Sequence, residues 1–356
     1  MVFEKRVDKL VEALGEVGCD GLLVTNLTNV YYLTGFHGTA GTVFVSPKHR
    51  LFVTDARYSL IAKESITGFD IIESRDAFSE IAKRIKDDKF ETLGFDSEVS
   101  YSLYQTLSQV FFEGYKLQAT SNVIESLRMV KDEHEVAIIK KACQISDQAF
   151  LDVLDFIKPN VTTELEVANF LDFRMRELGA SGPSFEFIVA SGERSSMPHG
   201  VASHKVIRDN EMLTMDFGCY YQHYVSDMTR TVHVGAASDE EKHIYETVLA
   251  SNQALLDVAK AGMTYRDYDR VARQVIDEAG YGAYFTHGIG HGIGLDIHEI
   301  PYFGKSDDKL QAGMALTDEP GIYIDGKYGV RIEDDLLVTE EGCELLTLAP
   351  KELLII

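Results

Sequence analysis

Hydrophobic and polar residues alternate with two different periods along the first third of the chain. Short apolar, β-rich runs occur at residues 21–26, 42–47 and 51–58, whereas the N-terminus and residues 81–88 place apolar positions at helical spacing. Strands that alternate with helices are typical of an α/β fold. The pattern therefore predicts a small α/β domain over residues 1–122.

The pattern becomes helical over residues 122–157, where apolar residues recur at spacings of three and four. We place a domain boundary between residues 122 and 123 for this reason. The charged run at residues 131–135 is expected to form the solvated face of a helix.

The rest of the chain mixes helical and β-rich stretches. Helices are predicted at residues 163–179 and twice within 238–279, and a β-rich hairpin is predicted at residues 212–234. This order predicts an α+β domain over residues 123–356, in which helices cover a mainly antiparallel sheet.

Length and composition agree with a folded protein of two domains. The chain has 356 residues, more than one hydrophobic core usually serves. Its formal net charge of -23 argues against nucleic acid and anionic membrane as partners, because both bind clustered Lys and Arg. No apolar run is long enough for a signal peptide or a membrane span, so we expect a cytoplasmic protein. Its 4 cysteines form no CxxC pair and are expected to be reduced thiols.

Candidate chemistry begins with acidic residues in unexpected places. Acids are depleted in strands, yet short apolar, strand-like runs contain Asp216, Asp227, Glu319 and Glu333. If the hairpin places Asp216 directly opposite Asp227, their Cβ atoms lie about 5 Å apart. Two bare carboxylates would repel each other there, so a cation is expected between them.

Divalent metal ions best account for these four acids. Buried carboxylates are costly unless protons or cations compensate them. The nearby basic residues, chiefly Arg230 and Arg331, are too few for four acids. Two divalent ions would balance the charge, and paired metal sites are well suited to hydrolysis.

Three histidines strengthen the prediction of a metal site. The segment THGIGHGIGLDIHE contains His287, His291 and His298, and its glycines permit close approach of the backbone. Neutral imidazole is the commonest metal ligand. The glycines lack the GxGxxG spacing of a dinucleotide site, and the chain contains neither GxSxG nor HExxH.

Four motifs together resemble the pita-bread metallopeptidases, and within them the proline-specific branch of aminopeptidase P and prolidase. They are MDFGCYYQHYVSDMTRT, THGIGHGIGLDIHE, LTDEPGIYI and GVRIEDD, in family order and with family spacing. The resemblance implies a C-terminal pita-bread (creatinase/aminopeptidase) domain preceded by a smaller α/β domain. It also implies a homodimer.

The resemblance implies five ligands for two metal ions. Asp216 would bind one ion through both oxygens, Asp227 and Glu333 would bridge, and His291 and Glu319 would complete the second ion. The oxygen-rich ligand set suits manganese, with cobalt, iron and zinc as alternatives.

Further roles come from the same resemblance. His298 and His199, the latter in SSMPHG, would contact the substrate and stabilise the tetrahedral oxyanion, and His287 would be a third such histidine. Glu319 would move the proton of the attacking water. Arg331 would be a partner of the ligands rather than a ligand.

The expected reaction is removal of the first residue from peptides with proline second, that of an Xaa-Pro aminopeptidase. A dipeptidase must hold the free carboxylate of its proline, for which Arg is well suited. Residues 300–318 contain Lys305 and Lys309 but no Arg. Asp318 departs from the Val of many relatives and is expected to affect the metal environment.

Other activities stay open at this point. The first alternative is an Xaa-Pro dipeptidase (prolidase). More remote alternatives are a pita-bread binding protein without peptidase activity, a creatinase-like hydrolase that needs no metal, and a methionine aminopeptidase. The presence of all five ligands argues against a metal-free protein.

Overall fold

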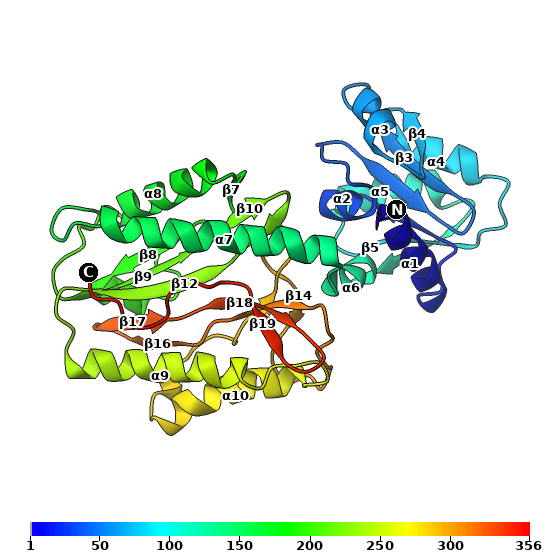
Figure 1. The fold of residues 1–356 in the computed structure, drawn as a ribbon. Helices are drawn as coiled ribbons and strands as arrows, with labels where there is room; N and C mark the ends of the chain where they lie inside the picture. The colour runs from blue at the N-terminus through cyan, green and yellow to red at the C-terminus, as the bar shows by residue number, and fades with distance from the viewer. Residues whose placement is uncertain (1) are drawn as a thin grey trace. The chain divides into compact units, whose positions relative to one another are not determined.

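The computed structural model describes residues 2–356, which form two compact units. The first unit ends at Arg128, and the second is Met129–Ile356. Figure 1 colours the first unit blue to cyan and the second green to red. Within the described residues, no helix has the length and apolar character needed to cross a membrane.

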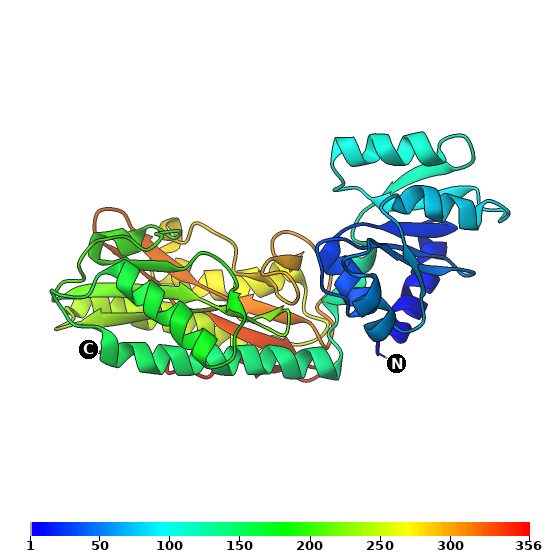
Figure 2. The same cartoon turned by 90° about the horizontal axis from the view of Figure 1, so that it is seen from above.

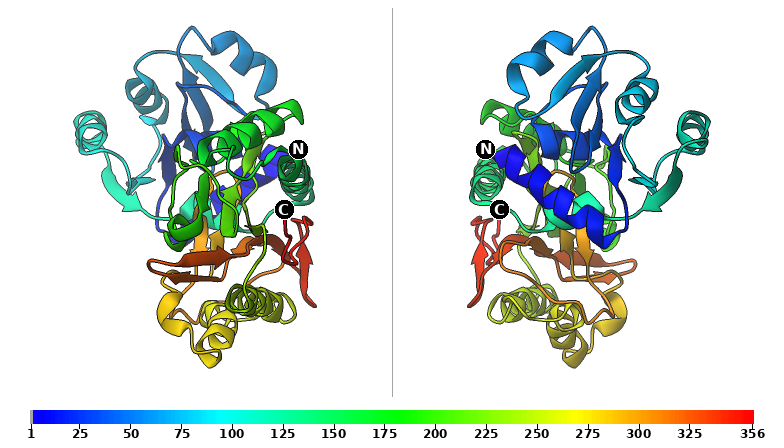
Figure 3. Two further views of the ribbon diagram at one scale, coloured as in Figure 1. Left: turned by 90° about the vertical axis from the view of Figure 1, so that its left-hand side faces the viewer. Right: turned by 90° about the vertical axis from the view of Figure 1, so that its right-hand side faces the viewer.

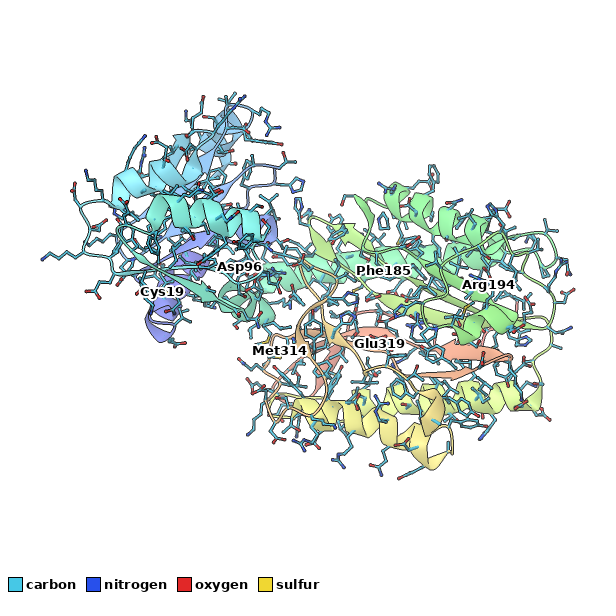
Figure 4. All side chains as sticks on the ribbon, turned by 180° about the vertical axis from the view of Figure 1, so that it is seen from behind. Cys19, Asp96, Phe185, Arg194, Met314 and Glu319 are labelled. Atoms are coloured by element: carbon cyan, nitrogen blue, oxygen red, sulfur yellow. The ribbon has the colours of Figure 1, made fainter. Side chains whose placement is uncertain are left out.

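The first unit is an α/β domain, as its alternating pattern predicts. Its sheet has the strand order β4-β3-β2-β1-β5-β6, in which β1, β2 and β3 pair antiparallel and β3/β4, β1/β5 and β5/β6 pair parallel. Figure 4 labels Cys19 and Asp96 in this unit. Its elements are α1 (Val2–Glu16), β1 (Gly21–Val24), α2 (Leu27–Thr34), β2 (Thr42–Val45), β3 (Arg50–Thr54), α3 (Ser59–Ser65), β4 (Asp70–Glu73), α4 (Ala77–Ile85), β5 (Thr92–Asp96), α5 (Tyr101–Phe111), β6 (Lys116–Thr120) and α6 (Val123–Met129).

The second unit places β-sheets between two layers of helices, which confirms the α+β prediction. The layer of α7 and α8 lies on one side of the strands and that of α9 and α10 on the other (Figures 1 and 3). In Figure 2, α7 runs along most of the length of this unit. The helices are α7 (Glu133–Phe156), α8 (Glu164–Glu177), α9 (Asp239–Leu256) and α10 (Tyr265–Glu278), with short 3₁₀ turns η1 (Gly192–Ser196) and η2 (Gly282–Tyr284).

The strands of the second unit form four small sheets. Their orders are β12-β9-β8, β14-β13-β15-β18-β19, β16-β17 and β11-β10-β7, and every pair in them is antiparallel. The strands are β7 (Gly182–Pro183), β8 (Ile188–Ser191), β9 (Glu211–Phe217), β10 (Cys219–Tyr221), β11 (Tyr224–Val225), β12 (Met228–Val234), β13 (His291–Gly292), β14 (Glu299–Tyr302), β15 (Ala315–Asp318), β16 (Gly321–Ile324), β17 (Tyr328–Arg331), β18 (Asp334–Val338) and β19 (Cys343–Leu345).

The predicted register of the central hairpin is wrong by two residues. Thr229, rather than Asp227, pairs with Asp216. The cause lies at the tip, where Tyr221 pairs with Tyr224 around a two-residue turn whose residues both have positive φ. Such a turn sets the register of its hairpin. A shift of two residues keeps every side chain on its face, so Asp216 and Asp227 still share one side of the sheet.

The helical stretch after residue 122 is interrupted, and its charged run is only partly solvated, with Glu133 and His134 exposed. Lys131 bonds through its backbone N–H to the carbonyl of Gly313, and α7 begins only after Asp132. Asp132 and Glu135 form a capping box, which stabilises the helix start. Lys131 and Glu135 are buried, at 6% and 2% exposed. The prediction was wrong for these two residues because local charge does not reveal a distant buried partner.

Candidate metal centre

One cavity of about 330 Å³ in the second unit brings the predicted site residues together. Figure 4 labels two residues that line it, Glu319 and Phe185. The nine predicted residues that line this cavity are His199, Asp216, Asp227, His287, His291, His298, Glu319, Arg331 and Glu333.

Each of the five predicted ligands lies at or next to the end of a strand that borders the cavity. Asp216 lies on β9 and Asp227 immediately before β12, while His291 begins β13. Glu319 directly follows β15, and Glu333 lies between β17 and β18. Residues far apart in the chain therefore meet because neighbouring strands end at one place.

Three of the side chains lie close enough together to bind one metal ion. Asp227, His291 and Glu333 each offer one ligand atom, and these atoms lie within 4.8 Å of one another. His291 Nε2 is 3.7 Å from Asp227 Oδ2 and 3.6 Å from Glu319 Oε1. These distances exceed hydrogen-bond length and leave space for an ion between the groups.

Arg331 and Thr229 hold the acids in place. Arg331 Nη2 donates to Asp216 Oδ2 at 2.6 Å, and its Nε donates to Thr229 Oγ1 at 2.9 Å. Thr229 Oγ1 in turn donates to Glu333 Oε2 at 2.6 Å. The chain of contacts links two predicted ligands through one guanidinium, and the expected role of Arg331 stays a prediction.

The electrostatics of the cavity favour bound cations. Burial raises the pKa of Asp216, and burial together with neighbouring carboxylates raises those of Asp227 and Glu333 well above their usual values. Burial raises the pKa of Glu319 to about 7. Burial lowers the pKa of His291 to about 4, so its imidazole is neutral at pH 7 and can bind a metal.

The residues fit divalent metal ions. The buried Oδ1 of Asp216 has no hydrogen-bond partner, although a buried carboxylate oxygen is costly without one. The other cation considered from the sequence, Arg230, contacts Asp334 and backbone carbonyls instead. An ion bound by oxygen and imidazole ligands would satisfy Asp216 and offset the clustered negative charge.

Tyr323, outside the prediction, contacts this centre, and the buried ion pair of Lys131 and Glu299, which was not predicted either, is not part of the cavity lining. Tyr323 OH lies 2.8 Å from His287 Nε2 and accepts from Arg331 Nη1 at 2.8 Å. Lys131 Nζ lies 2.7 Å from Glu299 Oε1, and both side chains are buried. Tyr323 stands inside the motif LTDEPGIYI, which is a signal, whereas nothing local marked Lys131.

Asp318 lies next to Glu319 in the chain but contacts other residues. It is buried, and its Oδ2 accepts from Asn252 Nδ2 of α9 at 3.1 Å. Successive strand residues point to opposite faces, which explains the separation. Its expected effect on the metal environment stays a prediction.

Comparison with known proteins extends over the whole chain. Residues 137–340 match metallopeptidase family M24, and residues 6–130 match the creatinase/prolidase N-terminal domain. The chain is 45% identical to a solved Xaa-Pro dipeptidase from Bacillus anthracis, with a TM-score of 0.96 and coverage of 99% of this chain and 100% of the other. A solved X-Pro aminopeptidase from Thermotoga maritima MSB8 is 39% identical, with a TM-score of 0.89 and coverage of 97% and 100%. An Xaa-Pro dipeptidase of Pyrococcus furiosus is 38% identical and covers 99% of this chain and 100% of its own.

Proposed function

The chain belongs to metallopeptidase family M24, and from this premise we propose that it is an Xaa-Pro dipeptidase. It would hydrolyse the bond between the first residue and the proline of a dipeptide. The observation that carries the proposal is the cavity that the five predicted metal ligands and three further histidines line together. Relatives named as dipeptidases, at 38% and 45% identity over the full length, support it.

We propose two divalent ions in this cavity, with manganese as the first choice, held by Asp216, Asp227, His291, Glu319 and Glu333. When bound, such ions lower the pKa of a water and polarise the scissile carbonyl. Cobalt, iron or zinc would serve the same ligand set. Metal analysis of the purified protein tests the number and the identity of the ions.

The chain's own residues then supply positioning and proton transfer. Glu319, whose pKa burial raises to about 7, is suited to accept and return a proton near neutral pH. His298 and His199 line the cavity and would hydrogen-bond the developing oxyanion or the adjoining backbone. Arg331 keeps Asp216 oriented throughout.

The size of the cavity favours a short substrate. Its volume of about 330 Å³ lies at the small end of the range for ligand sites, roughly 300–1,000 Å³. The bond that precedes proline has no N–H, so the site must accept a ring on the leaving side. A dipeptide meets both conditions.

An Xaa-Pro aminopeptidase, expected from the sequence, is the second candidate. Residues 300–318 contain no Arg to grip a free carboxylate. In that segment Tyr302 lines the cavity and is 57% exposed. The similarity to a protein named X-Pro aminopeptidase supports this reading too. The homodimer and the cytoplasmic location remain predictions.

A comparison of substrates separates the two candidates. kcat/KM is measured with manganese for an Xaa-Pro dipeptide and for the same dipeptide extended by one or two residues. We expect at least a tenfold preference for the dipeptide, about 1.4 kcal/mol in transition-state binding. A preference for the longer peptides would establish the aminopeptidase. Failure to cleave any of them would favour the binding protein or the creatinase-like hydrolase.

A further inference from the structure

An ion pair on α10 contacts the loop that carries His287. Asp269 and Arg273 stand one helical turn apart, with Arg273 Nε 2.8 Å from Asp269 Oδ2 and Nη2 2.8 Å from Oδ1. Their side chains are 18% and 29% exposed. This two-point geometry fixes the plane of the guanidinium.

The same pair binds the loop from Phe285 to Ile289 at three backbone groups. Arg273 donates to the carbonyl oxygens of Phe285 at 3.1 Å and His287 at 2.8 Å. Asp269 Oδ1 accepts from the N–H of Ile289 at 3.1 Å. The guanidinium carbon also lies 4.2 Å from the centre of the Phe285 ring. Every second residue of the loop is therefore held.

The held loop supports the metal centre in two places. His287 Nε2 lies 2.8 Å from Tyr323 OH, which accepts from Arg331. The carbonyl of Ile289 accepts from the N–H of Glu319 at 2.9 Å. The loop thus contributes one histidine to the cavity and supports the backbone of one predicted ligand.

We propose that Arg273 and Asp269 are positioning residues, which fix the loop from Phe285 to Ile289 and so place His287 in the cavity. The proposal rests on the proposed function insofar as His287 contacts substrate. The loop is followed by a Gly-rich segment, and glycine restricts the backbone less than any other residue. Arg suits this task because its rigid fork can donate to a carboxylate and to two carbonyls at once.

A second ion pair on α10 provides a matched control. Arg270 Nη2 lies 2.8 Å from Asp267 Oδ1, and the Arg270 side chain is 62% exposed. Among the described contacts, the hydrogen bonds of Arg270 go to Asp267 alone. Arg270→Met thus removes a helical ion pair without releasing the loop.

The experiment follows Arg273→Met, Arg273→Lys and Arg270→Met in the full chain loaded with manganese. Hydrogen exchange of the peptide spanning residues 285–289 reports the loop directly. For Arg273→Met we expect faster exchange there and a fall in kcat/KM for an Xaa-Pro dipeptide of roughly 10- to 100-fold, as for a misplaced group. Arg273→Lys keeps the charge but loses the fork, and should lie between wild type and Arg273→Met. Arg270→Met should stay within about twofold of wild type.

A double-mutant cycle shows whether Arg273 acts through His287. If it does, Arg273→Met lowers kcat/KM far less in the His287→Ala background than in wild type. Equal effects in both backgrounds would overturn the proposal, as would unchanged exchange in both Arg273 variants. If wild type cleaves no Xaa-Pro peptide, the proposed function fails, and the exchange result alone decides whether the pair holds the loop.

Discussion

Asp227 and Glu333 are neighbouring buried carboxylates that repel each other. Among the described hydrogen bonds, neither of them accepts from a basic side chain. Glu333 accepts from the Thr229 hydroxyl, and Asp227 has its nearest basic atom in His291, 3.7 Å away. Carboxylates in such surroundings bind a proton or a metal ion. Their side chains therefore provide the most direct test of the metal centre.

Replacing Asp227 with Asn or Glu333 with Gln should remove most activity and bound metal while the protein stays folded. A neutral amide keeps the size of the side chain but bridges two cations poorly. Turnover, metal content and thermal unfolding are measured together. Asp239→Asn, at a fully exposed acid of α9, is the control. Turnover near that of wild type in both variants would refute the ligand assignment.

Replacing His298 with Ala should leave the metal content unchanged and lower kcat by roughly 100-fold or more, as for the loss of an oxyanion donor. The His298 ring lies 4.4 Å from that of His291, between ring centres, so it is a neighbour of a predicted ligand. Metal analysis distinguishes the two roles. Loss of metal from this variant would make His298 a ligand and contradict its proposed contact with substrate.

At the scale of elements, the junction between β9 and β10 determines where the two aspartates lie. Gly218 stands there, and a Cβ at this position would lie 1.9 Å from the backbone oxygen of Ser226. The junction leaves room only for glycine. The close approach brings the ends of β9 and β12 together, with Asp216 before the glycine and Asp227 after the serine.

Gly218→Ala should therefore destabilise the protein and weaken metal binding. Overpacking against the backbone typically costs roughly 1–3 kcal/mol. Chemical unfolding and metal titration measure the two effects. Gly342→Ala is the matched control, because a Cβ there would meet nothing within 4 Å. Equal stability of the two variants would show that the backbone at Gly218 can move aside without cost.

At the scale of the whole molecule, metal ions and folding are coupled. An ion that binds only the folded state stabilises it by about 2.7 kcal/mol at a concentration 100 times its Kd. Removal of metal by a chelator should thus lower the melting temperature and abolish activity, and manganese should restore both. Calorimetry with and without the chelator is the measurement. No change in melting temperature would contradict a metal centre of this kind.

The metal-free protein should also lose stability as the pH rises. The pKa of Glu319 is raised from 4.5 to about 7 in the folded state, so the folded state keeps its proton where the unfolded state has lost it. Stability therefore falls between about pH 4.5 and pH 7, since the unfolded state binds fewer protons there. Manganese should flatten this fall. Unfolding curves at several pH values, with and without metal, provide the comparison.

The sequence by itself determined the class of each domain and nine of the residues that line the cavity. The spacing of apolar residues that marks a strand or a helix depends only on neighbouring residues. The same holds for the face of the sheet on which a strand residue lies. Asp216 and Asp227 therefore shared a face even though their predicted pairing was wrong. The motifs likewise identified the side chains that now line one cavity.

Only the tertiary structure decided which partners these residues meet. The bonds from Arg331 to Asp216 and from Lys131 to Glu299 join residues more than a hundred positions apart. Their partners depend on how strands end and loops pack, which no local pattern records. The contacts of Asp269 and Arg273 with the loop that carries His287 are of the same kind, because an ion pair on a helix looks alike in the sequence whether it contacts solvent or a loop.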